Sequence, residues 1–390
     1  MTVAPGDAVA LAKTLVRVDS RNPSLVPGAP GEGPVARALA EVLRSWGIAA
    51  DVVDAGPNRP NVVARVGRAG GRTLMFNGHL DVVGTDGMTH EPFAANERDG
   101  SIWGRGSSDM KGGVAAMCAA AARAAANGLD CEIVLTAVAD EEFGSFGTRA
   151  LIAGGVRADA AIVTEPTRLA IAPAHRGFVW TTVTVRGRAA HGSRYDVGID
   201  AIRHAGLLLA ELDALESSEL VRRTHPLLGR ASWHASTIDG GLGMSTYPDR
   251  CTLRIERRTL PGETPEQAVE EVRDACARVR ATHPSFDAVV ALDLAQNPSD
   301  VAVDAPVVRR LGRALTSIGE PTRVEGLSAW TDAALLNEAG IPAICFGPGD
   351  IARAHAAAEW IEIDEIERAT RVLTTLAGAW ARDEDAVWRT

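Results

Sequence analysis

The chain has 390 residues, of which 46% are hydrophobic, so it is long enough for two domains and for a sizeable core. Its net charge of −10 argues against nucleic acid or an anionic membrane as a partner. The cysteines are scattered and form no C-x-x-C pair, which indicates a reducing compartment and neither a disulfide framework nor a cysteine metal site.

Neither a signal peptide nor a membrane span is predicted. The N-terminal segment "MTVAPGDAVALAKTLVRVDS" becomes polar before an apolar stretch of sufficient length begins. The most apolar helical segment, "VAAMCAAAARAAANGL", is too short to span a bilayer and carries Arg123. We therefore expect a soluble cytoplasmic protein.

The first part of the chain alternates between two patterns. Residues 6–18 and 33–47 have apolar residues at helical spacing, and Gly47 is a suitable helix end. Apolar runs that predict strands cover residues 61–67, 73–83, 132–140 and 160–166. Several are apolar on both faces, which is typical of strands inside a sheet covered by helices on both sides.

The order of elements changes after residue 177. The predicted series is strand, helix, strand, strand, helix and strand, at residues 178–187, 198–215, 231–240, 249–259, 264–281 and 287–295. This order indicates a compact sheet with two helices on one side. Alternating helices and strands return beyond residue 295. We predict an α/β domain formed by residues 1–177 and 295–390, interrupted by a smaller domain at 178–294.

Histidines and carboxylates follow the predicted strands, at the sheet edge where open α/β sheets bind ligands. In "FNGHLDVVG", His79 and Asp81 share a strand face, so His79 could bind a metal while Asp81 orients its ring. A polar strand end is the alternative. Asp109 precedes an Ala-rich helix that it could equally cap. Glu165 could be an ordinary acid after a strand, and His355 a structural histidine.

The segment "TAVADEEFGSFG" adds three consecutive carboxylates, Asp140, Glu141 and Glu142, directly after a strand. Each motif alone has an ordinary explanation, but five strand ends of one domain carry such residues. Two imidazoles and several carboxylates, without thiolates, suit zinc, cobalt or manganese. A carboxylate that bridges two such ions holds them about 3.5–4 Å apart. The joint pattern predicts a two-metal site.

The ordered motifs "GHLDVV", "GRGSSDMKGG", "ADEEFGSFG", "TEPT", "RAAHGS", "RTLPGE" and "FGPG…AH" resemble the dinuclear zinc amidohydrolases and metallopeptidases. That family includes acetylornithine deacetylase, succinyl-diaminopimelate desuccinylase, aminoacylase and carboxypeptidase G. The resemblance extends from about residue 8 to residue 380. It implies a zinc-exopeptidase-like mixed sheet flanked by helices, interrupted by a ferredoxin-like α+β lid and dimerisation domain.

The resemblance also assigns roles in the metal site. Asp109 would bridge two divalent ions, most suitably zinc, with cobalt or manganese as substitutes. Glu141 would be the general base toward the bridging water, and the peptide bond from Asp109 to Met110 would be cis. The remaining ligands would be His79 and Glu165 at one ion, and Glu142 and His355 at the other.

Further roles would belong to the substrate site. His191 would stabilise the oxyanion, across a homodimer formed through the inserted domain, although a solvated loop histidine is the alternative. Arg258 would hold the substrate carboxylate, or else form an ion pair with Glu256. Ser245 stands where many relatives carry Asn, so the acyl group that relatives prefer cannot be transferred to this chain. Gly349, in the Gly-Pro-Gly turn, is the third expected substrate-binding residue.

The leading functional hypothesis is a deacylase that hydrolyses the amide bond of N-acyl amino acids. A dipeptidase or carboxypeptidase-like enzyme would use the same chemistry, and "DEEFGSFGTRALI" resembles that branch, whereas "SAWTDAALL" and "ERRTLPGE" resemble deacylases. A non-catalytic metal-binding scaffold is the third hypothesis. It would have lost a ligand or the base, but all five ligand positions and Glu141 are present.

Overall fold

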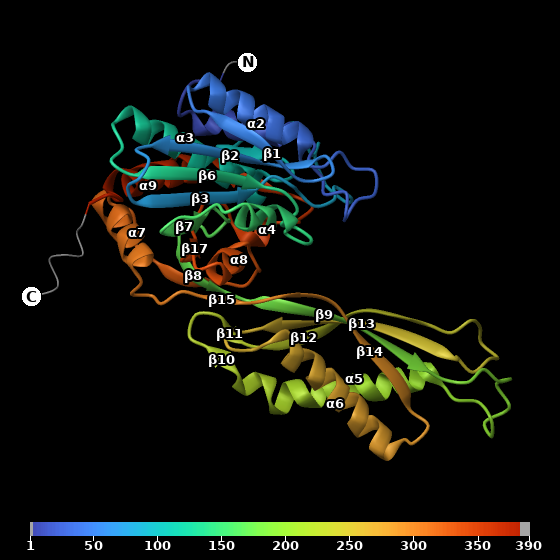
Figure 1. Cartoon of the computed structure of the whole chain (residues 1–390). Coiled ribbons are helices and arrows are strands. Elements are labelled where there is room, and N and C mark those ends of the chain that lie inside the picture. Colours follow the sequence, from blue (N-terminus) through green and yellow to red (C-terminus); the bar gives the residue numbers. More distant parts are fainter. Residues whose placement is uncertain (1–2, 383–390) are drawn as a thin grey trace, which may run out of the picture. The chain divides into compact units, whose positions relative to one another are not determined.

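The structure is a computed structural model that describes residues 3–382 (Figure 1). The described chain forms two compact units. The main unit contains residues 3–173, 301–325 and 331–382, and the inserted unit contains residues 174–300 and 326–330. Within the described residues, no helix combines the length and the apolar character that a membrane span needs.

A mixed sheet forms the centre of the main unit. Its four middle strands are mutually parallel, and antiparallel strands flank them on both sides. In spatial order the strands are β1 (Ala50–Gly56), β2 (Arg59–Gly67), β6 (Glu132–Val138), β3 (Thr73–His79), β7 (Ala160–Val163), β17 (Ala343–Cys345) and β8 (Ile171–His175). The mixed sheet expected from the resemblance is therefore confirmed.

Helices cover this sheet (Figure 1). One group packs with the inward residues of β3 and β6 into a single core: α1 (Ala8–Val16), α2 (Gly33–Ser45), α3 (Gly112–Ala126), α7 (Pro306–Ser317) and α9 (Ile363–Ala379). Because α3 is built largely from alanine, it fits against α1 and α9 with most of its residues buried. Two shorter helices, α4 (Phe146–Ala153) and α8 (Ala333–Glu338), contact each other and the sheet.

A small separate sheet lies next to the start of α3. It contains β4 (Asn96–Arg98), β5 (Ser101–Trp103) and β18 (Trp360–Glu362), in the order β18-β5-β4. This pairing brings the chain after His355 beside the segment that leads to Asp109. Two segments that are distant in sequence therefore run together here.

The inserted unit has the predicted order of elements. They are β9 (Gly177–Arg186), α5 (Ala201–Ser218), β12 (Ser232–Gly240), β13 (Arg250–Thr259), α6 (Pro265–Thr282) and β14 (Asp287–Gln296). The strands form an antiparallel sheet in the ferredoxin-like order β12-β13-β9-β14, with both helices on one face (Figure 1). Val183, Val185, Cys251, Leu253 and Ile255 are buried beneath these helices.

Some elements differ from the predictions. β1 was not predicted, because its sequence "ADVVDAG" is an exposed edge strand with weak apolar alternation. The hairpin of β10 (Thr224–His225) and β11 (Gly229–Arg230) was also not predicted. β15 (Ser299–Asp300) pairs with the end of β8 and keeps residues 295–300 in the inserted unit. The strands predicted at 73–83 and 160–166 end earlier, at His79 and Val163.

Candidate metal centre and catalytic site

Most of the predicted site residues of the main unit follow strands of its sheet. His79 is the last residue of β3, and Glu165 follows β7, which runs parallel to β3. Glu141 and Glu142 follow β6, whose Val138 is paired with His79. Parallel strands end at the same edge of a sheet, so their following residues converge there.

Five side chains form two overlapping groups at this edge. His79, Asp109 and Glu165 can place one ligand atom each within 4.8 Å of the others, and so can Asp109, Glu142 and His355. Asp109 belongs to both groups. His79 Nε2 lies 3.0 Å from Asp109 Oδ1, and His355 Nε2 lies 3.0 Å from Glu142 Oε2 and 3.5 Å from Asp109 Oδ2.

The three consecutive carboxylates have three different surroundings. Asp140 has a φ of +70° and turns inward, where its side chain meets Arg59 at 2.9 Å. Glu142 belongs to the second ligand group, whereas Glu141 belongs to neither. Glu141 Oε2 lies 4.0 Å from His79 Nε2, and its side chain is largely buried. Glu141 is therefore a carboxylate beside the ligand groups that is not needed to complete them.

The cluster carries excess negative charge. Burial and the charge of Asp109 raise the pKa of Glu165 well above its usual value, and burial and Glu165 do the same to the pKa of Glu141. Burial alone would lower the pKa of His79, but the hydrogen bond to Asp109 and the charge of Glu141 raise it well above normal. In all three residues the neighbouring carboxylates favour the protonated form, in addition to the effect of burial.

The donor set fits a pair of divalent cations. Glu165 Oε1 is buried and has no hydrogen-bond partner among residues 3–382. Within that same range, the ion pairs of Asp109, Glu141 and Glu142 involve histidines and no lysine or arginine. Imidazole nitrogens and carboxylate oxygens suit zinc, cobalt and manganese. The charge, the orphaned oxygen and the ligand types all agree with metal binding.

Asp109 does not cap a helix, which was its alternative role. Its carboxylate faces the two histidines, and α3 begins without a side-chain cap. The hydrogen bonds to His355 and His79 outweigh burial and lower the pKa of Asp109. The peptide bond between Asp109 and Met110 is cis, as the resemblance implied.

Asp81 contacts His79 differently from the expectation. His79 Nδ1 lies 2.9 Å from the backbone carbonyl of Asp81, while the Asp81 carboxylate stands 3.7 Å away, beyond hydrogen-bond range. That carboxylate instead accepts the backbone N–H groups of Glu141 and Glu142, each at 3.2 Å. Asp81 therefore supports the turn that carries both glutamates, as well as the ring of His79.

Three further residues hold this turn, and they are not among the predicted site residues. Asn22 Nδ2 donates to Asp81 Oδ2 at 2.8 Å and to Asp140 Oδ1 at 3.0 Å. Arg59 pairs with Asp140 and with the buried Glu32. No local pattern marks these residues, because their partners are distant in the sequence. Only their burial in the structure distinguishes them.

The other predicted residues lie mainly in the inserted unit. His191 is exposed, and its Nδ1 lies 2.8 Å from Ser193 Oγ. Ser245 lies beside it, since its carbonyl accepts the N–H of Gly192 at 2.8 Å. Arg258 forms the ion pair with Glu256 that was its alternative role, and it lies over the ring of Phe178.

Gly349 belongs to the main unit and lies in a turn that packs closely against Ser108. Its φ is +93°, and a Cβ there would lie 2.6 Å from Ser108 Oγ. Its N–H donates to Glu365 Oε2 at 2.7 Å. A side chain is therefore excluded at this position in the turn before His355.

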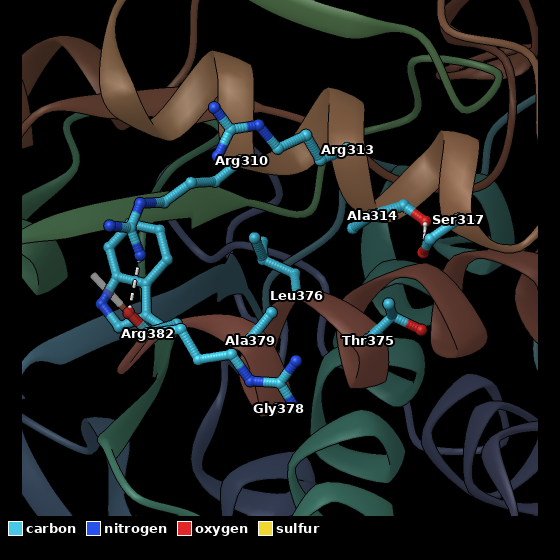
Figure 2. Close-up of a pocket in the computed structure, with 10 residues that line it drawn as sticks. Arg310, Arg313, Ala314, Ser317, Thr375, Leu376, Gly378, Ala379 and Arg382 are labelled. Atoms are coloured by element: carbon cyan, nitrogen blue, oxygen red, sulfur yellow. Dashed lines mark hydrogen bonds between the residues drawn. The ribbon is translucent and has the colours of Figure 1, made fainter. Parts of the chain in front are cut away.

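A pocket of about 310 Å³ lies elsewhere in the main unit, between α7 and α9. Figure 2 shows Arg310, Arg313 and Leu376 among the residues that line it. None of the residues predicted to form the site lines this pocket. The candidate site is defined by side-chain chemistry at the sheet edge and not by this cavity.

An α/β sheet with two metal-ligand groups and a free carboxylate at its edge defines a metal-dependent hydrolase. The sequence matches the description "Peptidase family M20/M25/M40" over residues 75–379. It is 33% identical over 330 residues to an acetylornithine deacetylase of Myxococcus xanthus, covering 82% of this chain and 84% of that one. The chain belongs to Peptidase family M20/M25/M40 and is an enzyme that hydrolyses amide bonds.

Other relatives carry different names. An N-formyl-4-amino-5-aminomethyl-2-methylpyrimidine deformylase of Bacillus subtilis (strain 168) is 28% identical, covering 96% of this chain and 94% of its own. The M20 family metallo-carboxypeptidase Sso-CP2 from Sulfolobus solfataricus superposes with a TM-score of 0.81 at 17% identity, covering 96% of this chain and 99% of its own. The latter similarity concerns the fold.

Proposed function

We propose that this enzyme hydrolyses the amide bond of N-acyl amino acids at a pair of divalent cations, most suitably zinc. His79 and Glu165 would hold one cation, Glu142 and His355 the other, and Asp109 both. The observation that carries the proposal is the arrangement of two ligand groups around Asp109 with Glu141 beside them and outside both. When bound, the cations would polarise the amide carbonyl and make water a stronger acid.

Glu141 acts as the general base. It accepts the proton of the attacking water as the C–O bond forms and donates that proton to the amine as the C–N bond breaks. Asp81 keeps Glu141 in place through the backbone N–H that its carboxylate accepts. The negative charge that develops on the carbonyl oxygen needs a donor, and we assign this role to His191.

Arg258, Ser245 and Gly349 are the proposed substrate-binding residues. Arg258 supplies a guanidinium suited to a substrate carboxylate, and its pairing with Glu256 fixes the direction of the side chain. Ser245 and His191 lie next to each other in the inserted unit, which supports a shared role for them. The curated relatives named as a deacetylase and a deformylase support N-acyl compounds as the substrate class.

The direct test is amine release from a panel of substrates by zinc- and cobalt-loaded protein. The panel contains N-acetyl, N-succinyl and N-formyl amino acids and unblocked dipeptides, and Glu141→Ala is the control. Cleavage of the blocked amino acids alone supports a deacylase. Cleavage of the dipeptides alone would instead assign the enzyme to the peptidase branch of the family.

We also propose that the enzyme is a homodimer that associates through the inserted unit. β12 is an edge strand of its sheet, and most of its residues are exposed. Ile238 on β12 is 56% exposed, and Leu242 and Met244, which follow it, are almost fully exposed. An unpaired strand next to apolar side chains can add a strand from a second copy. The cytoplasm is the proposed location, since all five cysteines are free and buried.

A further inference from the structure

Glu359 is a buried carboxylate that the proposed chemistry does not use. It lies directly before β18, on the segment that follows His355, and its relative exposure is 0%. A buried carboxylate is unfavourable unless it is paired and hydrogen-bonded. The partners of Glu359 therefore indicate its role.

Those partners belong to the segment that carries Asp109. Glu359 Oε1 accepts the backbone N–H groups of Ser108, at 3.0 Å, and Asp109, at 3.1 Å. Glu359 Oε2 pairs with Arg105 Nη1 at 2.7 Å, and both side chains are buried. Arg105 is held in turn, because its Nε donates to the carbonyl of Gly84 at 3.0 Å. Glu359 Oε1 thus holds the backbone of Ser108 and Asp109, and Glu359 Oε2 holds the side chain of Arg105 on the same segment. The Glu359 carboxylate therefore attaches the segment before β18 to the segment that carries Asp109.

Two more contacts join the same pair of segments. The backbone carbonyl of Glu359 accepts the N–H of Gly104 at 3.1 Å, and the N–H of Asp350 donates to Ser108 Oγ at 3.1 Å. The chain on both sides of His355 is thus attached to the segment before α3. His355 itself has a half-exposed side chain and a φ of +59°, so its position depends on these attachments.

We propose that Glu359, together with Arg105, is a positioning residue that sets the placement of His355 relative to Asp109. It would thereby control the affinity of the group formed by Asp109, Glu142 and His355 for its cation. This inference rests on the proposed two-cation site. The group that contains His79 and Glu165 depends on it less, because those residues are placed by β3 and β7 of the central sheet.

The test is a titration of metal-free protein with Co²⁺, in which binding is measured by calorimetry and by visible absorption. Glu359→Gln keeps the size of the side chain and an acceptor for the two backbone N–H groups, but it turns an amide donor toward Arg105. We expect the Kd of one of the two cations to rise about 10- to 100-fold, as for other residues that orient metal ligands, with the other Kd little changed. The selective change is what a purely structural role would not produce.

Glu320→Gln is the matched control. It also removes a carboxylate that pairs with an arginine of the main unit, Arg368 on α9, and it should leave both Kd values as in the wild type. An unchanged pair of Kd values in Glu359→Gln, or an equal weakening of both together with a lower melting temperature of the metal-free protein, would overturn the inference.

A second variant covers the case in which Glu359→Gln does not fold. Glu359→Asp keeps the charge but withdraws the carboxylate from the backbone of Ser108 and Asp109, so the same selective weakening is expected. The wild-type titration separates this inference from the proposed function. Binding of fewer than two cations by the wild type would contradict the two-cation site, whereas two cations bound equally well by wild type and variants would contradict only the role of Glu359.

Discussion

Glu141 and Glu142 are neighbours in sequence, and the structure gives them different partners. Glu142 Oε2 contacts His355, while Glu141 lies near His79 and completes neither ligand group. The backbone N–H groups of both residues donate to the Asp81 carboxylate, so the turn from which the two side chains extend is held in place. A matched pair of substitutions can separate their roles.

We expect Glu141→Gln to lower kcat about 10²- to 10⁴-fold, the usual contribution of a general base, while both cations stay bound. Glu142→Gln should instead lower the number of cations retained after dialysis, because it removes a charged ligand. Metal content by mass spectrometry and kcat on the same samples provide the measurement. Full activity of Glu141→Gln, or loss of metal from it alone, would contradict the assignment.

His175 provides a prediction about pH and stability. Its Nδ1 lies 3.0 Å from the carbonyl of Arg176 and so carries the proton, while burial lowers its pKa to about 4. The unfolded chain, with a histidine pKa of about 6.5, therefore binds a proton that the folded state resists. The contribution of neutral His175 to the free energy of unfolding is fully present above about pH 6.5, and it is lost as the pH falls toward 4.

Between pH 7 and pH 5 this histidine should lower the free energy of unfolding by about 2 kcal/mol. His175→Gln cannot titrate, so its loss of stability over the same range should be smaller by about that amount. Urea unfolding of both proteins at the two pH values gives the comparison. Each protein serves as its own reference, which removes any effect of the substitution that is independent of pH. Equal losses would contradict the prediction.

At the scale of elements, the site depends on how closely α3 approaches the end of β7. Gly113 lies in the first turn of α3, and a Cβ there would stand 2.0 Å from the carbonyl oxygen of Thr164. This approach places the start of the helix, and Asp109 before it, next to Glu165. The second glycine of the "DMKGG" motif is therefore explained by packing.

Gly113→Ala should destabilise the protein by about 1–3 kcal/mol or more and weaken metal binding, because the added methyl group pushes α3 away from Thr164. Gly378→Ala is the matched control in α9, where a Cβ would meet nothing within 4 Å. It should be neutral or stabilise the protein by up to about 1 kcal/mol, through helix propensity. Thermal unfolding and metal titration of both variants test this, and equal behaviour of the two would refute it.

At the scale of the whole molecule, the chain forms its main sheet from segments on both sides of the inserted unit. β17, for example, pairs with β7 although the entire inserted unit lies between them in sequence. The inserted unit has its own sheet and its own core beneath α5 and α6. Its exposed edge strand β12 is the feature that leads to a prediction about assembly.

We expect the wild-type protein to sediment as a dimer and Ile238→Lys, on β12, to sediment as a monomer, because a charged side chain at an edge strand opposes pairing. Leu292→Lys is the control on β14, the opposite edge of the same sheet, where Leu292 is also exposed, at 49%. It should remain dimeric. A monomeric wild type would contradict dimerisation, and dissociation by Leu292→Lys alone would place the interface on β14.

Much of the fold followed from the sequence, because apolar periodicity is a local property. The helices at α1, α2, α5 and α6 and the strands at β2, β6, β9 and β13 all lie where their patterns predicted them. The chemical types needed for a metal site could also be recognised at the ends of predicted strands. The grouping of those residues, however, came from the family resemblance, since spacing alone left each residue with an ordinary alternative.

The sequence by itself determined most of the elements, the order of elements in the inserted unit and the set of histidines and carboxylates available for metal binding. Only the tertiary structure decided which groups touch. It turned Asp81 toward the backbone of Glu141 and Glu142, paired Arg258 with Glu256, and brought Glu359 to Asp109. The physical reason is that periodicity reports which face of one element is buried, whereas a contact between distant segments depends on strand order and on the packing of the whole core.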